Sequence, residues 1–276
     1  MKINFKNKEH YKNLQKIRKK ILIAGFKANE GHIPSGLSIL EIIYVLYKFR
    51  ILRNFKKLDN FKRDRFILSK GHGSLAIYGV LNFLNLITDK QLYSFCKFNS
   101  KLGGHPDRTK SPYLEVSTGS LGHGLPIAVG LAYSLKKQYP KNSPKVFCLI
   151  GDGEANEGTT WETLLFACSR KINNLIIIID FNLSGERAIP MKNINKLFSG
   201  FNAELLITDG HDINKLYSIL TKKNKSMPKI IIAKTIKGKG VKLMENNPVW
   251  HHKSPNESEL DSLIKELLSI LFFFLK

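Results

Sequence analysis

Two polar residues, Asp152 and Asn182, lie thirty positions apart, and each follows a short apolar run at 146–150 or 175–179. These runs are too short to form helices of their own, so we predict that both are buried strands. A right-handed crossover through a helix at about 157–170 makes such strands parallel and brings their carboxyl ends to one edge of a sheet. We therefore expect Asp152 and Asn182 to converge.

The carboxylate and amide oxygens of these two residues are hard ligands that suit Mg²⁺ or Ca²⁺. Between them, Gly153 permits close approach of a ligand and offers a main-chain N–H to a phosphate oxygen. We interpret the pattern as a site in which one metal ion bridges the protein and a diphosphate. Gly-Asp-Gly alone would indicate only a turn, and Asn182 alone only a loop residue. Their spacing on neighbouring strands favours the metal site.

The segment from Gly151 to Asn182 resembles the thiamine-diphosphate motif, which opens with Gly-Asp-Gly and closes with Asn about thirty residues later. Within that superfamily the chain is most similar to transketolase. The similarity extends over nearly the whole chain, because further segments that resemble transketolase follow in the family's order at 30–42, 64–73, 104–106, 115–124, 233–240 and 250–251.

The resemblance implies roles for residues at matching positions. The metal ligands would be Asp152, Asn182 and the main-chain carbonyl of Ser184. Contacts to thiamine diphosphate would come from His72, Gly119, Leu121, Gly153, Glu154, Asn182 and His251. Ketol transfer moves protons on sugar hydroxyls and carbonyls near neutral pH, which suits imidazoles. The catalytic histidines would be His32, His72, His105 and His251, whereas His10, His123, His211 and His252 are expected to be structural or peripheral.

The family's activating glutamate belongs to a separate pyrimidine-binding domain, and no such segment is recognisable in these 276 residues. The resemblance therefore implies the N-terminal subunit of a split transketolase that acts on sugar phosphates. Its partner would be a C-terminal subunit carrying the pyrimidine domain, in an (αβ)2 assembly. Two alternatives remain open, namely a subunit of another thiamine-diphosphate enzyme (2-oxo acid dehydrogenase or deoxyxylulose-phosphate synthase-like) and a basic nucleic-acid-binding or scaffold protein. The histidine set favours transketolase.

Composition bears on partners and location. The net charge is +22, but the lysines are scattered and form no long basic block, so we expect no nucleic-acid partner. The three cysteines lack metal-ligand spacing, and the N-terminus lacks an apolar signal segment. The apolar run 267–275 is about half the ~20 residues that span a bilayer. We expect a cytoplasmic protein in which this run packs as a terminal helix.

The surrounding pattern predicts the elements that position these residues. Helical periodicity covers about 9–50, 75–86, 125–139 and 213–223, and strands are expected near Phe66 and at 203–207 and 229–233. Such alternation indicates an α/β fold with a doubly wound, mainly parallel sheet, helices on both faces and an N-terminal helical segment. We expect residues 1–276 to form one domain. The chain departs from the family pattern at 33–35, at His252 and at 183–190, and the changes at 33–35 and His252 predict a different loop shape near the substrate.

Overall fold

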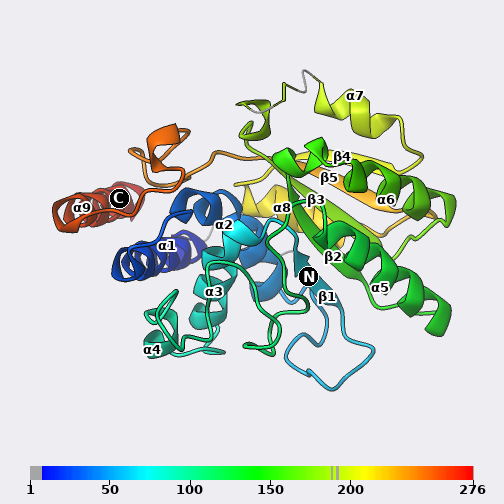
Figure 1. Ribbon diagram of the computed structural model, residues 1–276, viewed down its shortest axis with the longest axis horizontal. Helices are drawn as coiled ribbons and strands as arrows, with labels where there is room; N and C mark the ends of the chain where they lie inside the picture. Colours follow the sequence, from blue (N-terminus) through cyan, green and yellow to red (C-terminus); the bar gives the residue numbers. More distant parts are fainter. Residues whose placement is uncertain (1–7, 188, 191–192, 276) are drawn as a thin grey trace.

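The computed structural model describes residues 8–187, 189–190 and 193–275, and its centre is a parallel sheet (Figure 1). The sheet has five strands in the order β1-β2-β3-β5-β4, and each neighbouring pair is parallel. Their bounds are β1 (Arg65–Leu68), β2 (Val146–Gly151), β3 (Leu175–Phe181), β4 (Glu204–Asp209) and β5 (Lys229–Lys234). The carboxyl ends of all five strands therefore lie at one edge, which confirms the predicted sheet.

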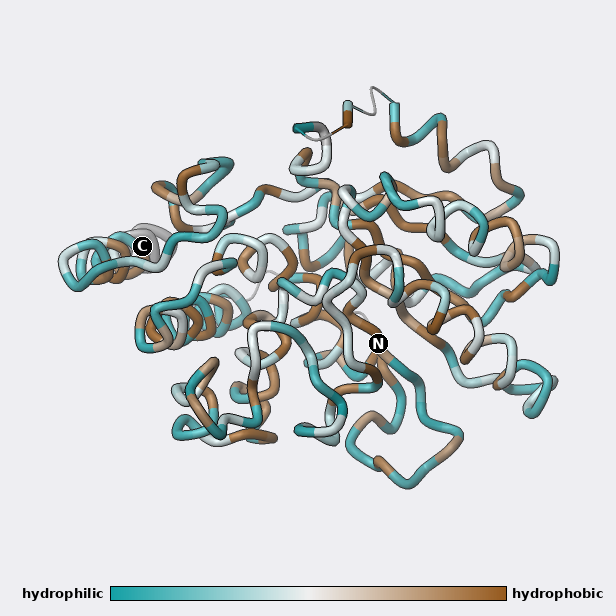
Figure 2. Tube along the Cα trace, in the orientation of Figure 1, coloured by the Kyte–Doolittle hydropathy of each residue, from teal (hydrophilic) through white to brown (hydrophobic). Residues whose placement is uncertain are grey.

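Alternate residues of each central strand enter two different cores. In β2, Phe147 and Leu149 pack into one core, whereas Val146, Cys148 and Ile150 pack into the other. The same alternation runs along β3, whose side chains 175–180 are all buried. Because both faces are covered, these strands are continuously apolar, and they are largely brown in Figure 2.

Helices cover both faces of the sheet, as predicted. The first core contains buried residues of α1 (Lys8–Ala28), α2 (Ile33–Lys48), α3 (Ser74–Phe83), α8 (Ile213–Thr221) and α9 (Glu257–Leu275). The second contains residues of α5 (Gly124–Gln138), α6 (Gly158–Ser169) and α7 (Ile194–Ser199). A short helix, α4 (Asp89–Leu92), follows α3. The fold is therefore a doubly wound α/β sheet with an N-terminal helical layer.

The terminal helix α9 packs against α1, and its Leu263 and Leu267 lie in the first core. This confirms the predicted packing at residue 267, while the side chains of 270–275 lie outside the described residues. No helix among the described residues is both long and apolar enough to cross a membrane.

One local difference from expectation lies directly after β2. The expected turn at 151–154 continues as a 3-10 helix, η2 (Asp152–Asn156), and α6 begins only at Gly158. Asp152 is therefore separated from the first turn of α6. Glu157, in an extended conformation, provides the break between the two helical segments.

Candidate active site

Asp152 and Asn182 converge at the carboxyl edge of the sheet. Gly151 pairs with Asp180 in the register of β2 and β3, so the residues that follow these strands leave the sheet side by side. The Gly185 N–H donates to Oδ1 of Asp152 at 3.2 Å, which ties the loop after β3 to the end of β2. The other carboxylate oxygen of Asp152 is buried without a hydrogen-bond partner among the described residues. A buried orphan oxygen of this kind fits a metal ligand.

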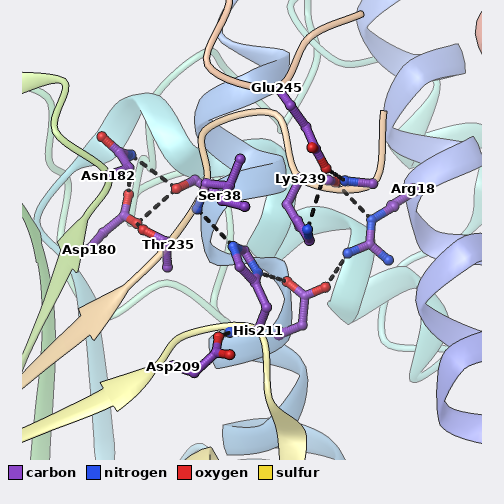
Figure 3. A network of polar contacts seen from close by, with 12 residues as sticks. Arg18, Ser38, Asp180, Asn182, Asp209, His211, Thr235, Lys239 and Glu245 are labelled. Carbon is purple, nitrogen blue, oxygen red and sulfur yellow. Dashed lines mark hydrogen bonds and ion pairs between the residues drawn. The ribbon is translucent and has the colours of Figure 1, made fainter. Parts of the chain in front are cut away.

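The Asn182 side chain is oriented by residues below it (Figure 3). Its amide nitrogen donates to Asp180 Oδ2 and to Ser38 Oγ, each at 3.0 Å. Its amide oxygen accepts the Ser184 N–H at 3.0 Å. Because both N–H donors point toward Asp180 and Ser38, the remaining lone pair of the amide oxygen is available on the opposite side, where a metal would bind.

Asp180 is itself held by a buried lysine. The Lys70 ammonium forms an ion pair with Asp180, and the two side chains are 2% and 0% exposed. The Thr235 hydroxyl also donates to this carboxylate. Burial, followed by the nearby Asp180 charge, raises the pKa of Asp152. A cation at the Asp152 oxygen would oppose that shift.

A polar cavity of about 350 Å³ opens beside Asn182 and Ser184. Its lining includes two cationic side chains, Lys237 and Arg187, and the imidazole of His251. Burial, and then the neighbouring Lys70 charge, lowers the pKa of Lys237 to about 8. A buried ammonium beside other cations is stabilised by an anion, so the cavity suits a diphosphate.

The predicted catalytic histidines cluster around His32. The ring centre of His32 lies 5.5 Å from His72, 6.5 Å from His105 and 5.7 Å from His251. His32 is the N-cap residue of α2, with a left-handed backbone (φ 63°), and its side chain makes no capping hydrogen bond. His32, His72 and His105 also line a second cavity of about 200 Å³. Residues from four separated segments are thus brought to one place.

The environment keeps several of these imidazoles neutral. Burial, together with the charge of His252, lowers the pKa of His32 to about 4. Burial and Lys70 hold the pKa of His72 well below its usual value, and burial and Lys237 lower that of His251. Near pH 7 these rings are therefore neutral, and each can accept a hydrogen bond from a hydroxyl of a bound polyol.

Known proteins share both this fold and this arrangement of segments. The family model described as "Transketolase, thiamine diphosphate binding domain" matches residues 10–268. The chain belongs to the transketolase family. Over 272 residues it is 39% identical to an apulose-4-phosphate transketolase subunit of Actinobacillus succinogenes, covering 96% of this chain and 98% of that protein.

Full-length transketolases are similar to this chain over part of their length. Human transketolase is 37% identical over 249 residues, which are 88% of this chain and 39% of that enzyme. Campylobacter jejuni transketolase superposes with a TM-score of 0.85 and 29% identity over 95% of this chain and 42% of that one. The transketolase domain seen here therefore spans less than half of these enzymes, but nearly all of the Actinobacillus protein.

Thiamine diphosphate with a divalent metal fits the residues present in this transketolase domain. The orphan oxygen of Asp152 and the oriented amide of Asn182 suit the metal. Ser184 lines the cavity beside Asn182. Gly153 packs closely against Gly185, so a Cβ added to Gly185 would lie 2.9 Å from Gly153. The two loops can approach each other this closely because position 185 is glycine, whereas a Cβ on Gly153 would be in ordinary contact with Gly185, at 3.9 Å.

The predicted pyrimidine-contacting loop meets the histidine turns. A Cβ on Gly71 would lie 3.0 Å from the Gly119 nitrogen and 3.0 Å from the His105 ring. The β1–α3 turn, the His105 loop and the Gly119 loop are therefore in contact. Leu121 is partly exposed in the same loop. Contacts of Gly119 and Leu121 with a cofactor stay a prediction.

Glu154, predicted to contact the cofactor, is occupied by contacts within the chain. Its carboxylate accepts from the Ser69 hydroxyl at 2.5 Å and from the N–H groups of Gly122 and Gly151, each at 2.9 Å. The side chain is buried, and burial is the largest influence that raises its pKa. Glu154 thus joins three loops that surround the site, and its direct contact with cofactor stays a prediction.

The structure adds residues that sequence reasoning assigned no role or a peripheral one. His252 was expected to be peripheral, yet its ring centre lies 4.5 Å from His32 and it lines the second cavity. Its main chain packs so closely on Gly31 that a Cβ there would lie 2.5 Å away. Lys70, Asp180 and Lys237 lacked an assigned role because their partners are distant in sequence. In the sequence, the only sign of a role was that each of them is a charged residue beside a glycine turn or a strand end.

Proposed function

We propose that this chain is the N-terminal, diphosphate-binding subunit of a two-chain transketolase. It would transfer a two-carbon ketol unit from a ketose phosphate to an aldose phosphate, together with a C-terminal subunit that carries the pyrimidine domain. The observation that carries the proposal is the histidine cluster around His32, one member of which, His251, lines the same cavity as Asn182. The high coverage of a relative that is itself named as a transketolase subunit supports the two-chain arrangement.

In this proposal, Asp152, Asn182 and the Ser184 carbonyl hold the metal, and Lys237 faces the diphosphate. Thiamine diphosphate, when bound, supplies the carbanion chemistry. The Lys237 ammonium lies 3.1 Å from Nδ1 of His251, so it donates to that nitrogen. The ring proton of His251 is then on Nε2, where it can be donated to a substrate oxygen.

His32 and His72 would complement this donor. Their lowered pKa values keep both rings neutral at pH 7. Nδ1 of His32 is buried without a partner among the described residues, so it can accept or donate one hydrogen bond to a ligand. With His105 on the third side, the cluster can hold the hydroxyl and carbonyl oxygens of a sugar and move protons between them.

The proposal extends to assembly and location. Glu157 and Glu162 are exposed at and near the start of α6, where they are free to meet a partner subunit. We further propose an (αβ)2 assembly, one domain over 1–276 and a cytoplasmic location. Three unpaired cysteines are consistent with a reducing compartment.

The test is reconstitution. The chain is combined with a candidate pyrimidine-domain subunit, and the mixture is assayed for ketol transfer from xylulose 5-phosphate to ribose 5-phosphate with thiamine diphosphate and Mg²⁺. Apulose 4-phosphate is included as a donor because the Actinobacillus relative carries that name. Activity is expected only with both chains and is expected to be lost in Asp152→Ala. Decarboxylation of a 2-oxo acid without ketol transfer would favour the dehydrogenase alternative, and full activity of the isolated chain would refute the two-chain proposal.

A further inference from the structure

The segment 235–240 carries Lys237, which lines the diphosphate cavity, that is, the cavity beside Asn182 and Ser184 that suits a diphosphate. Residues outside the segment hold the main chain of 235–240 in place. The Ile236 N–H, next to Lys237, donates to Nε2 of His211 at 2.8 Å. The Gly238 N–H donates to the carbonyl oxygen of Pro34, in the first turn of α2, at 3.0 Å. The polar groups on both sides of Lys237 are therefore satisfied by residues outside the segment.

The contact with Ile236 determines the tautomer of His211. Since Nε2 accepts a main-chain N–H, the ring proton is on Nδ1. Nδ1 lies 3.0 Å from Oε2 of Glu41 and donates to it. Both nitrogens of the His211 ring (Figure 3) are thus bonded, Nδ1 to Glu41 and Nε2 to the Ile236 N–H, which fixes the orientation of the ring.

Glu41 is anchored in turn by Arg18 of α1. The two side chains form an ion pair and are each 4% exposed. Burial would raise the pKa of Glu41, but Arg18 and then His211 hold it below its usual value. Arg18 Nε also donates to the carbonyl oxygen of Lys239 at 3.0 Å. The ion pair therefore contacts the same segment a second time, three residues beyond Ile236.

Gly240 makes the second contact possible. A Cβ at this position would lie 2.4 Å from Arg18 Nε, and the backbone has a φ of 87°. Both features favour glycine. The Gly240 N–H is also bound by Glu245 at 3.0 Å. Neither Arg18, Glu41 nor His211 lines either of the two cavities described above.

We infer that Arg18, Glu41 and His211 form a positioning relay that fixes the main chain on both sides of Lys237 and so holds its ammonium at the diphosphate cavity. The inference rests on the proposed function, because it concerns how this chain presents a cation to the diphosphate. His211 is a positioning residue that acts through Lys237. His211 was expected to be structural or peripheral. In the relay its structural role has a consequence for the site, because His211 holds Lys237 in place.

The relay predicts a specific effect on anion binding. Mg²⁺–pyrophosphate is titrated calorimetrically into the full chain, which tests the cavity without thiamine chemistry. His211→Phe keeps a ring of similar size but removes both hydrogen bonds. We expect its Kd for Mg²⁺–pyrophosphate to rise by about tenfold, as for the loss of one charge-assisted hydrogen bond. His211→Gln, which can restore a hydrogen bond to Ile236, is expected to recover part of the affinity.

His10→Phe is the matched control. His10 is also buried in the helical layer, and its Nδ1 lies 2.9 Å from the Tyr44 hydroxyl of α2, away from the 235–240 segment. Its substitution should lower thermal stability without changing the Kd. A nitrogen-15 NMR spectrum gives an independent readout, because wild-type His211 should show the Nδ1–H tautomer.

A double-mutant comparison shows whether His211 acts through Lys237. In a Lys237→Ala background, which weakens binding by itself, His211→Phe should raise the Kd by less than twofold further. Additive effects, an unchanged Kd in folded His211→Phe, an Nε2–H tautomer, or no pyrophosphate binding by the wild-type chain would each overturn the relay. Coupled pyrophosphate binding without ketol transfer in the reconstituted enzyme would refute the proposed reaction and leave the relay intact.

Discussion

Replacing Lys70 by methionine would break the buried ion pair beneath the metal site. Methionine keeps the apolar stem but leaves Asp180, which is 0% exposed, with three uncharged donors. These are Ser38 at 2.8 Å, Asn182 at 3.0 Å and Thr235. Removing one partner of a buried pair costs about 3–5 kcal/mol. Because three hydrogen bonds remain, we expect the lower end, a loss of about 3 kcal/mol in the free energy of unfolding.

Urea unfolding of the full chain measures this loss, and a thermal melt should show a fall of about 6 °C at roughly 2 °C per kcal/mol. Asp180→Asn is the companion variant. In the double variant neither charge remains buried alone, so the sum of the two single losses should exceed the loss in the double variant by about 2 kcal/mol. Two results would refute the view that Lys70 and Asp180 form a buried charge pair. One is a loss below about 1 kcal/mol in the free energy of unfolding of Lys70→Met, and the other is a loss in the double variant equal to the sum of the two single losses.

The Asp180→Asn variant also tests what orients the Asn182 side chain. An asparagine at 180 can present either its oxygen or its nitrogen, so the Asn182 amide loses its fixed orientation. Changes to residues that orient a metal ligand typically lower metal affinity about 10–100-fold. We expect Asp180→Asn to weaken Mg²⁺-dependent binding of pyrophosphate within that range. Unchanged affinity would show that Asp180 supports stability alone.

Three further predictions concern the site itself. Asp152→Ala should abolish Mg²⁺-dependent binding of thiamine diphosphate in calorimetry while circular dichroism stays unchanged, and retained affinity would mean that Gly-Asp-Gly is only a turn. The pKa of His32 is about 4 in the folded chain and 6.5 in the unfolded one, so between these pH values the unfolded chain binds more protons. The free energy of unfolding should therefore fall as the pH drops from 6.5 toward 4. A His32→Asn variant whose urea midpoint falls equally over that window would contradict this. His252→Gly should remove the ring 4.5 Å from His32 and shift KM for the sugar phosphates of the reconstituted enzyme by about 3- to 10-fold with little change in cofactor Kd, whereas an unchanged KM would return His252 to a peripheral role.

The strands and the convergence of Asp152 with Asn182 were predictable from local pattern. The runs 146–150 and 175–179 are apolar on both faces, a pattern typical of a buried parallel sheet, and parallel strands share an edge. His72 was placed correctly in a strand-to-helix turn for the same reason, because it follows β1 directly. These inferences need only the period of the sequence and the handedness of the crossover.

The remaining features depend on contacts between distant segments. The Lys70–Asp180 pair joins residues 110 positions apart, and the His211–Glu41 bond joins residues 170 apart. Nothing in local periodicity selects these partners. His252 enters the histidine cluster because its backbone packs on Gly31, a close approach that only the assembled fold reveals. Glu154 is a similar case, since its hydrogen bonds to Ser69 and Gly122 join loops that are distant in sequence, while its contact with the cofactor stays a prediction.

The strand order has a consequence for how the protein is made. β4 is synthesised before β5, yet β5 lies between β3 and β4 in the finished sheet. Until residues 229–234 leave the ribosome, β3 presents an unpaired edge formed by four consecutive isoleucines, 176–179. Such an apolar, β-branched edge is a template for pairing with other chains. A nascent chain stalled before residue 229 should therefore aggregate or recruit chaperones, whereas one released beyond residue 234 can bury that edge.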